Sequence, residues 1–214
     1  MKKYRCLELF SGTGSVGKVF EKNGFEVISL DNEPRWNATH CCDIMDFDYK
    51  SYPSGYFDVI WASPPCTSFS SARWFGKRSK GVTDESLYND IVNQGLPPLK
   101  KTLEIIKYLK PKIWFIENPQ TGKMKEYLDL AYSDCAYCQY GMKYRKNTRI
   151  WNNIGLNLEK CRCRGHHLES ILTYQKRDRY TDQKQVSNKF MTYVIPEKLV
   201  ESIFDQTIKY LESK

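Results

Sequence analysis

The residues with the clearest chemical potential follow a short apolar run near residue 60. Residues 58–62 are rich in β-branched and aromatic side chains and predict a buried strand. Pro64 and Pro65 end that strand, because proline cannot donate to a sheet ladder, and Cys66 follows at once. A thiol at the carboxyl end of a strand in an open α/β sheet is a candidate nucleophile, and a buried structural cysteine is the alternative.

A possible acid follows another predicted strand. Residues 112–116 form an apolar run, and Glu117-Asn118-Pro119 comes directly after it. Ligands and chemistry in open α/β sheets gather at the carboxyl ends of the strands. Glu117 is therefore a candidate acid at a second strand end, at the edge where Cys66 is expected.

A ligand-binding loop is predicted near the start of the chain. Residues 4–10 predict a first strand, and the glycine-rich stretch 11–17 leads into a helix that ends near Asn23. Glycines let the backbone approach a ligand, and the amino end of a helix presents free N–H groups, although a tight turn has the same composition. Asp31 ends a second strand, at 25–30, where a carboxylate can bind ribose hydroxyls or cap a turn.

The elements that must position these residues alternate between strand and helix. Asp43-Ile44 lies in the stretch 41–47, a plausible third strand end, and a helix is predicted from Pro97 to Leu109. Further strands are predicted at 134–140 and 148–151, and a final amphipathic helix runs from 196 to 211. This alternation predicts an α/β fold with a doubly wound, mostly parallel sheet.

The charge and the cysteine content of the chain indicate the kind of partner it binds and the compartment in which it works. The net charge is +8, and residues 142–180 hold ten basic and three acidic side chains. This predicts a polyanionic partner, with a solvated basic face as the alternative. Eight cysteines without an evident disulfide framework, no signal peptide and no membrane-length apolar run predict a reduced, soluble, cytoplasmic protein. A long polar loop is expected at 71–86, and its basic and aromatic residues suit nucleic acid.

The ordered set of motifs resembles that of the DNA (cytosine-5) methyltransferases, in particular their compact viral and phage-like members. Glu8 begins a stretch, 8–14, similar to the first cofactor motif, although aspartate is more usual at its position. The other matching blocks are Asp31, Asp43-Ile44, Pro64-Pro65-Cys66, Glu117-Asn118-Pro119 and Arg145-Lys146-Asn147-Thr148-Arg149. Any one block is a weak signal, whereas the ordered set is specific.

The resemblance implies a Rossmann-like methyltransferase that uses S-adenosyl-L-methionine to methylate carbon 5 of cytosine in DNA. Catalytic roles fall on Cys66 as nucleophile, Glu117 as acid and Arg149 as a clamp on the base. The implied cofactor-binding residues are Phe10, Ser11, Gly12, Thr13, Gly14, Asp31, Asp43, Ile44 and Pro65. Phe10 would stack on the adenine, Asp31 would bind the ribose, and Asp43 would bind the adenine amine.

The implied partner is double-stranded DNA with the target base flipped out, bound by a monomer; a nuclease partner cannot be read from the sequence. The expected DNA-contacting residues are Arg73, Lys77, Arg78, Arg162, Arg164, Arg177 and Arg179. The chain is divided into a catalytic domain at 1–150, a small basic target-recognition insertion at 151–190 and a helix at 191–214 that packs back. Two departures from the family stand out: the insertion is shorter than usual, and Asn147 replaces an arginine, which leaves Arg149.

Three alternatives remain open. The substrate could be transfer RNA, because one branch of the family acts on it, or the chain could be an inactive nucleic-acid-binding relative. Cysteine and histidine at short spacing could also bind zinc, which takes four such ligands; the residues are Cys135, Cys138, Cys161, Cys163, His166 and His167. A predicted strand at 134–140 would point the first two thiols to opposite faces, and a basic DNA-facing loop is the other interpretation.

Overall fold

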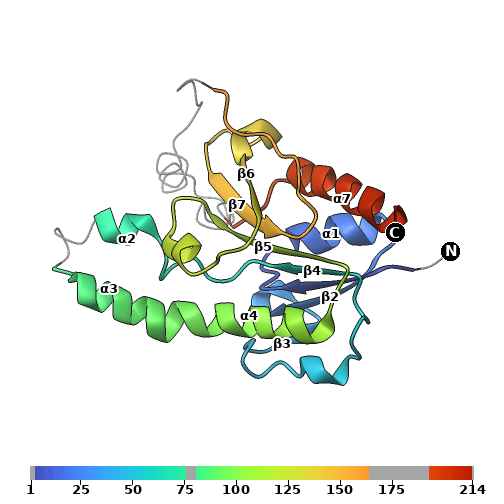
Figure 1. Ribbon diagram of the computed structural model, residues 1–214, viewed down its shortest axis with the longest axis horizontal. Coiled ribbons are helices and arrows are strands. Elements are labelled where there is room, and N and C mark those ends of the chain that lie inside the picture. Colours follow the sequence, from blue (N-terminus) through green and yellow to red (C-terminus); the bar gives the residue numbers. More distant parts are fainter. Residues whose placement is uncertain (1–2, 76–80, 164–192, 214) are drawn as a thin grey trace, which may run out of the picture.

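The structure is a computed structural model that describes residues 3–75, 81–163 and 193–213. A seven-stranded sheet lies at its centre, in the order β3-β2-β1-β4-β5-β7-β6 (Figure 1). The strands are β1 (Arg5–Leu9), β2 (Glu26–Asp31), β3 (His40–Cys41), β4 (Val59–Ala62), β5 (Ile113–Pro119), β6 (Tyr132–Ala136) and β7 (Asn147–Asn152). The first five strands in the sheet are parallel, and β7 runs antiparallel to both β5 and β6.

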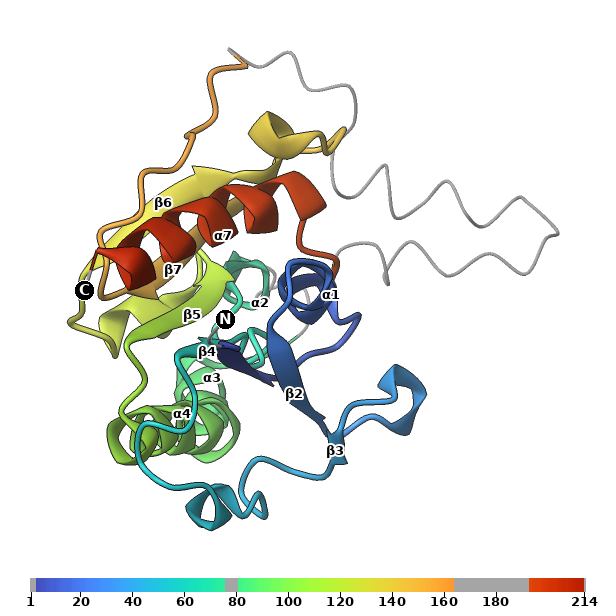
Figure 2. The same ribbon diagram turned by 90° about the vertical axis from the view of Figure 1, so that its right-hand side faces the viewer.

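Helices cover both faces of this sheet, as Figures 1 and 2 show. The helices are α1 (Ser15–Lys22), α2 (Ser71–Phe75), α3 (Asp84–Asp90), α4 (Leu96–Leu109) and α7 (Glu197–Glu212). Helices α1 and α7 pack together on one face, where the rings of Phe20 and Phe204 lie 5.2 Å apart. Helix α4 covers the other face, and a π-helical segment, Ile91–Gly95, joins it to α3.

The two cores follow from the alternation of side chains along each strand. On β1, Cys6 faces the core under α1 and α7, whereas Leu7 faces the core under α4. Both are fully buried, as expected for a parallel strand that is covered on both sides. The predicted fold class, a doubly wound and mostly parallel α/β sheet, is confirmed.

Two predicted strands have different ends in the structure. The strand predicted at 112–116 continues to Pro119, because β7 pairs with its far half and supplies hydrogen-bond partners there. Glu117 therefore lies within a strand rather than after one. The stretch 41–47 is mostly turn, because β3 ends at Cys41 and the Asp43 carboxylate accepts a hydrogen bond from the backbone N–H of Met45 at 2.8 Å.

Two other segments are folded differently from the prediction. The expected long loop at 71–86 contains α2 and the start of α3, which Thr83 caps by accepting a hydrogen bond from the Ser86 N–H at 3.1 Å. The strand predicted at 134–140 stops at Ala136, and a 3-10 turn, Tyr137–Tyr140, follows it. The alternation of apolar residues along 134–140 fits a continuous strand as well as a shorter strand followed by a tight turn, so it did not show where β6 ends.

Part of the predicted DNA-binding surface lies outside the described residues, and so does most of the 151–190 insertion. The residues concerned are Lys77, Arg78, Arg164, Arg177 and Arg179, together with His166 and His167. The division into three parts stays a prediction, although β7 runs across its boundary at residue 150. Within the described ranges, every helix is too short or too polar to span a lipid bilayer.

Candidate active site

A cleft of about 320 Å³ opens where the loops after β1, β2 and β4 meet the end of β5. Cys66 and Glu117 both line it, together with Phe10, Gly12 and Asp31. A second cavity, of about 510 Å³, adjoins it and is lined by Asp43 and Ile44. Both cavities share the residues Phe10, Asn32, Pro65 and Thr67. The structure thus brings the predicted nucleophile, acid and cofactor loop into one cleft, with Asp43 and Ile44 in the adjoining cavity.

The loop after β1 has a backbone that is shaped for close approach. Phe10 has a φ of +59°, an uncommon conformation for a bulky side chain, and its ring borders both cavities. Gly12 and Gly14 also have positive φ, at +47° and +66°, where glycine is favoured. The Gly14 N–H donates to the carbonyl oxygen of Ser11 at 2.8 Å, which closes the turn immediately before α1.

Asp31 fixes the relative position of the loops after β1 and β2. One oxygen of its buried carboxylate accepts a hydrogen bond from the Gly12 N–H at 2.8 Å, and the other accepts one from the Glu33 N–H at 2.9 Å. Glu33 and Trp36 line the cleft beside it. Neither was predicted from the sequence, although a carboxylate and an indole directly after a strand-ending aspartate are the signal that could have found them.

Glu8 is a buried carboxyl group beneath the same loop. Its two oxygens accept hydrogen bonds from the Val16 N–H at 3.3 Å and the Gly17 N–H at 3.0 Å, at the amino end of α1. Burial raises the pKa of Glu8 to about 7, against the lowering effect of these hydrogen bonds. A Cβ atom on Gly17 would lie 2.6 Å from a carboxylate oxygen of Glu8, so glycine is required for this close approach.

Cys66 lies half-buried on a loop that side-chain and backbone hydrogen bonds hold in place. The Asn118 side-chain amide donates to the carbonyl oxygen of Pro64 at 2.9 Å, which ties this loop to β5. The carbonyl oxygen of Cys66 accepts a hydrogen bond from the Phe69 N–H at 3.1 Å. Burial raises the pKa of the Cys66 thiol, whereas the positive charge of Lys146 acts to lower it.

Glu117 is buried on β5, and its carboxylate accepts a hydrogen bond from the Tyr137 hydroxyl at 3.4 Å. Burial raises its pKa, while the charge of Lys146 and hydrogen bonds from Tyr137 and Ser63 act to lower it. The net shift is upward, so the protonated carboxylic acid is favoured relative to a solvent-exposed glutamate.

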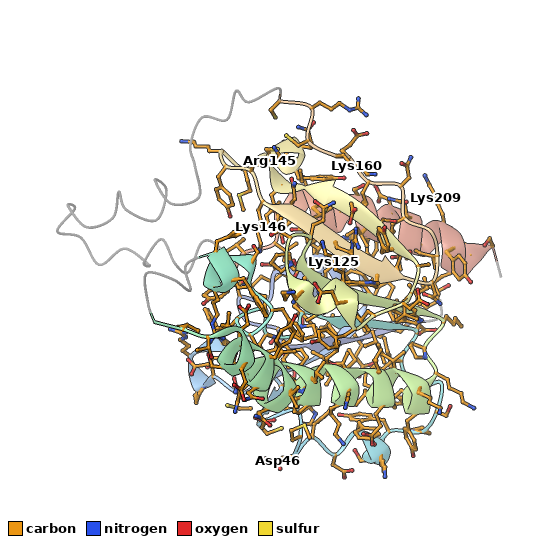
Figure 3. All side chains as sticks on the ribbon, turned by 60° about the vertical axis from the view of Figure 1, so that its left-hand side comes forward. Asp46, Lys125, Arg145, Lys146, Lys160 and Lys209 are labelled. Carbon is orange, nitrogen blue, oxygen red and sulfur yellow. The ribbon has the colours of Figure 1, made fainter. Side chains whose placement is uncertain are left out.

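Lys146 supplies positive charge to the cleft from the turn before β7. Its ammonium group lies 4.7 Å from the centre of the Tyr137 ring, and Lys146, labelled in Figure 3, is one of the residues that line the cleft. It acts electrostatically on both Cys66 and Glu117. The sequence motif that contains Lys146 gave it no role of its own.

The structure does not bring Arg149 to Cys66 and Glu117. Its guanidinium group donates to both carboxylate oxygens of Asp134, at 2.8 and 2.9 Å, and lies 3.5 Å from the centre of the Tyr132 ring. Ile150 is opposite Glu117 in the sheet register, and side chains alternate along a strand. Arg149 consequently points to the face opposite Glu117, and it is not among the described residues that line the cleft.

The remaining predicted residues occupy other positions. Ser11 and Thr13 line the cleft with Gly12, whereas Gly14 is not among the described residues that line it. Arg73 forms an ion pair with Asp90, which joins α2 to α3, and it lines the second cavity. Arg162 is 77% exposed and pairs with Glu159 at 2.7 Å, so it is open to a polyanion.

One wall of the cleft comes from the segment that precedes α7. Tyr193 and Ile195 line the cleft, and the Ile195 N–H donates to the Ser15 hydroxyl at 3.3 Å. Neither residue was predicted from the sequence, because no local pattern indicates a contact between segments 180 residues apart.

Comparisons with known proteins agree with this geometry. The family described as C-5 cytosine-specific DNA methylase matches residues 4–145 of the chain. A probable DNA (cytosine-5)-methyltransferase of Frog virus 3 (isolate Goorha) is 40% identical over 156 residues, which cover 70% of this chain and 71% of that protein. The type II methyltransferase M.PspPI of Psychrobacter sp. (strain TA137) is 27% identical over 129 residues, 55% of this chain but 27% of that protein.

A solved structure supports the fold alone. A methyltransferase of Entamoeba histolytica, EhMeth, superimposes with a TM-score of 0.50 at 17% identity and covers 76% of this chain and 58% of that one. The family match spans both Cys66 and Glu117 and extends over more than half of the chain. The chain therefore belongs to the C-5 cytosine-specific DNA methylases, which confirms the resemblance and the enzyme class that the motifs predicted.

Proposed function

We propose that this chain methylates carbon 5 of cytosine in DNA through a covalent adduct of Cys66, with S-adenosyl-L-methionine as the methyl donor. The observation that carries the proposal is a single cleft lined by the Cys66 thiol, the buried Glu117 carboxyl group and the glycine loop after β1. Family membership supports the reaction class. The adduct, the cofactor and the flipped base go beyond family membership and belong to the proposal.

The residues around the cleft fit an adenosine-containing cofactor. The Phe10 ring borders both cavities, which suits an aromatic surface for adenine, and Asp43 lies in the second cavity beside it. A Cβ atom built on Gly12 meets nothing within 4 Å, so the loop leaves open space at that position. Asp31 and Glu33 place carboxylates where ribose hydroxyls could donate. When bound, S-adenosyl-L-methionine supplies an electrophilic methyl group.

The chemistry needs a nucleophile because carbon 5 of cytosine reacts poorly with an electrophile. The Cys66 thiolate would add to carbon 6, forming a carbon–sulfur bond and moving electron density onto the ring. Glu117 would donate a proton or hydrogen bond at ring nitrogen 3, where that density collects. After methylation at carbon 5, loss of the carbon 5 proton to a base and departure of the Cys66 sulfur from carbon 6 restore the aromatic ring.

The two groups need opposite protonation states, and burial favours only one of them. Burial raises the pKa of Glu117 and so favours the protonated form that an acid needs, but it also raises the pKa of the Cys66 thiol. Lys146 lowers the pKa of Cys66 and thus opposes the burial effect at the nucleophile. We assign Lys146 the role of stabilising the Cys66 thiolate, and we assign no catalytic role to Arg149, which does not line the cleft.

The target atom of such a reaction lies within the DNA duplex and must be exposed. Enzymes that modify bases flip the nucleotide into a pocket at a cost of a few kcal/mol. The half-buried position of Cys66 within the cleft suits a base that has left the helix. The exposed Arg162 could neutralise phosphate outside it.

A direct transfer assay tests the proposal. The purified chain is incubated with methyl-labelled S-adenosyl-L-methionine and either duplex DNA or transfer RNA, and the product is hydrolysed to nucleosides. The expected result is label in 5-methyl-2′-deoxycytidine from the DNA. Label in RNA alone would assign the substrate to the transfer RNA alternative, and transfer to neither would favour an inactive relative.

A further inference from the structure

Three cysteines converge at the outer edge of the sheet, away from the proposed active site. Cys138 lies on the 3-10 turn after β6, and Cys161 and Cys163 lie on the segment that follows β7. The three Sγ atoms all lie within 4.8 Å of one another. All three side chains are half-buried, and none of the eight cysteines is in a disulfide.

The structure removes the reason that the sequence offered against Cys138 as a metal ligand. Alternation along a strand would have pointed Cys135 and Cys138 to opposite faces. Because the strand stops at Ala136, Cys138 belongs to a turn and faces the other two thiols. Cys135 stays on the strand and is buried in the core under α7.

The spacing suits a tetrahedral metal ion. Zinc–sulfur bonds of about 2.3 Å in tetrahedral geometry place the sulfurs about 3.8 Å apart, so the thiols need to move together by about 1 Å at most. Thiolates are the ligands that select zinc among the common divalent ions. Two ligands separated by one residue, with a third from a distant turn, would join two segments that lie far apart in the sequence.

The surroundings are those of a site that holds thiolates. The Gln139 side-chain amide donates to the sulfur of Cys163 at 3.3 Å and to that of Cys138 at 3.8 Å, and such outer hydrogen bonds orient metal ligands. Arg145 and Lys160, labelled in Figure 3, line a small cavity with Cys161 and bring positive charge to that side.

The backbone on both sides of the cluster is fixed. The Ala136 N–H donates to the carbonyl oxygen of Glu159 at 3.0 Å, and the Glu159 N–H donates to the Tyr140 hydroxyl at 2.8 Å. Gln206 of α7 holds Asn157 through two hydrogen bonds, at 2.8 and 3.1 Å. The thiols therefore meet on anchored segments, which lowers the entropy cost of binding a metal ion.

We propose that Cys138, Cys161 and Cys163 bind a structural zinc ion, which fastens the segment after β7 to the turn after β6. The three thiolates supply three of the four positions of the tetrahedral site. Cys161 and Cys163 belong to the stretch 151–190 that the sequence assigned to target recognition, so the ion would anchor part of that stretch.

The test measures zinc in the whole chain, purified under reducing conditions without chelators. Elemental analysis should find about one zinc ion per chain. Substitution with Co²⁺ should give the intense thiolate-to-cobalt charge-transfer absorption, which reports sulfur ligands without relying on any variant. In competition with a chromophoric chelator, Cys138→Ser and Cys163→Ser should each weaken zinc binding by at least about 100-fold.

The exposed Cys41 provides the matched control, because Cys41→Ser removes a thiol at the opposite edge of the sheet and should leave zinc binding unchanged. Wild-type protein that takes up neither zinc nor cobalt would overturn the proposal. So would equal zinc affinity in the wild type and the two cluster variants. An intact mass lower by two hydrogens, with a disulfide mapped between two of these cysteines, would identify an oxidised pair in place of a metal site.

Discussion

The five parallel strands and the antiparallel pair β7 and β6 contribute to the cleft in different ways. The parallel strands β2 and β4 deliver their functional residues at or beyond their carboxyl ends, because Asp31 is the last residue of β2 and Cys66 follows β4. The antiparallel pair acts through the turn residues beside its strands. Lys146 precedes β7 and Tyr137 follows β6, whereas Arg149 within β7 faces away.

This difference separates two roles in the proposed reaction. In that reaction, the parallel part holds the groups that would bind the cofactor and react with the base. The antiparallel part surrounds them with a charge and a hydroxyl, since Lys146 acts on both Cys66 and Glu117 and Tyr137 donates to Glu117. Glu117 lies on β5, where the two parts meet. Substitutions on either side should therefore have effects of different kinds.

Glu117→Gln, at the junction of the two parts, should have the largest effect. The amide cannot donate a proton at ring nitrogen 3, so kcat should fall by roughly 10²–10⁴. Affinity for S-adenosyl-L-methionine, measured by calorimetry, should stay within a factor of a few. Glu212→Gln, at the exposed end of α7, is the control. Activity close to wild type would show that Glu117 is a structural residue. Catalysis would then not depend on the strand where the two parts meet.

Glu8→Gln tests the role of the buried Glu8 carboxyl group in the parallel part, through the pH dependence of the unfolding free energy. The pKa of Glu8 is about 7 in the folded chain against 4.5 for an exposed glutamate. Folded-state protonation therefore contributes stability that is fully present below about pH 4.5 and is lost as pH rises through about 7.

Between pH 5 and pH 8 this contribution amounts to about 2–3 kcal/mol of unfolding free energy. We expect urea denaturation at pH 5 and pH 8 to show a smaller decline of the unfolding free energy in Glu8→Gln than in the wild type. The difference between the two declines should equal this amount. Glu212→Gln again serves as the control, because its exposed carboxyl group lies at the far end of α7, and it should decline as the wild type does. An unchanged decline in Glu8→Gln would show that the carboxyl group is ionised throughout.

Arg149→Met tests whether the antiparallel strand itself takes part in catalysis. The variant leaves Asp134 without its bidentate partner in a site where both side chains are at most 13% exposed, although Gln120 still donates to it, so it should lower the unfolding free energy by about 2 kcal/mol. At a temperature where the variant is folded, kcat should remain within a factor of a few of wild type. A selective loss of kcat in a stable variant would restore the clamp that the family resemblance implied.

Lys146→Met should have the smallest effect in free energy, about 1.4 kcal/mol for a 10-fold change in rate, and the most specific one. Loss of the positive charge should shift the rising limb of the pH–rate profile, assigned to Cys66, to higher pH and lower kcat at neutral pH by about 10-fold. At high pH the rate should recover toward wild type. Lys143→Met, three residues away and exposed, should leave the profile in place. A loss of kcat that is the same at all pH values would show that Lys146 acts through packing rather than through its positive charge.

The parallel part was largely predictable because its signals are local. A strand, a glycine-rich turn or a proline pair, and a reactive residue follow one another directly in the chain, so Cys66 and Gly12 could be placed without knowledge of the sheet. Glu117 was predicted for the same reason, although the strand continues past it. The contacts among these residues then follow from the parallel order of the strands.

The antiparallel part was less predictable because its contacts depend on the register of strands distant in sequence. Arg149 and Lys146 lie three residues apart, and only the pairing of Ile150 with Glu117 decides which side of the sheet Arg149 faces. The early end of β6 at Ala136, which frees Cys138 from the strand, has no clear sequence signal. Tyr193 lines the cleft beside Ile195, whose hydrogen bond to Ser15 joins segments 180 residues apart, and no local pattern encodes such a contact.

The most direct measurement is covalent trapping on duplex DNA in which cytosine is replaced by 5-fluorocytosine. Fluorine cannot leave as a proton, so a methylated adduct should accumulate when S-adenosyl-L-methionine is present, and the intact mass of the protein should rise by that of the bound DNA. Peptide mapping should place the attachment at Cys66. Cys66→Ser should form no adduct, whereas Cys41→Ser should form it as the wild type does. An adduct that persists in Cys66→Ser, or methylation of ordinary cytosine by that variant, would show that Cys66 is not the nucleophile.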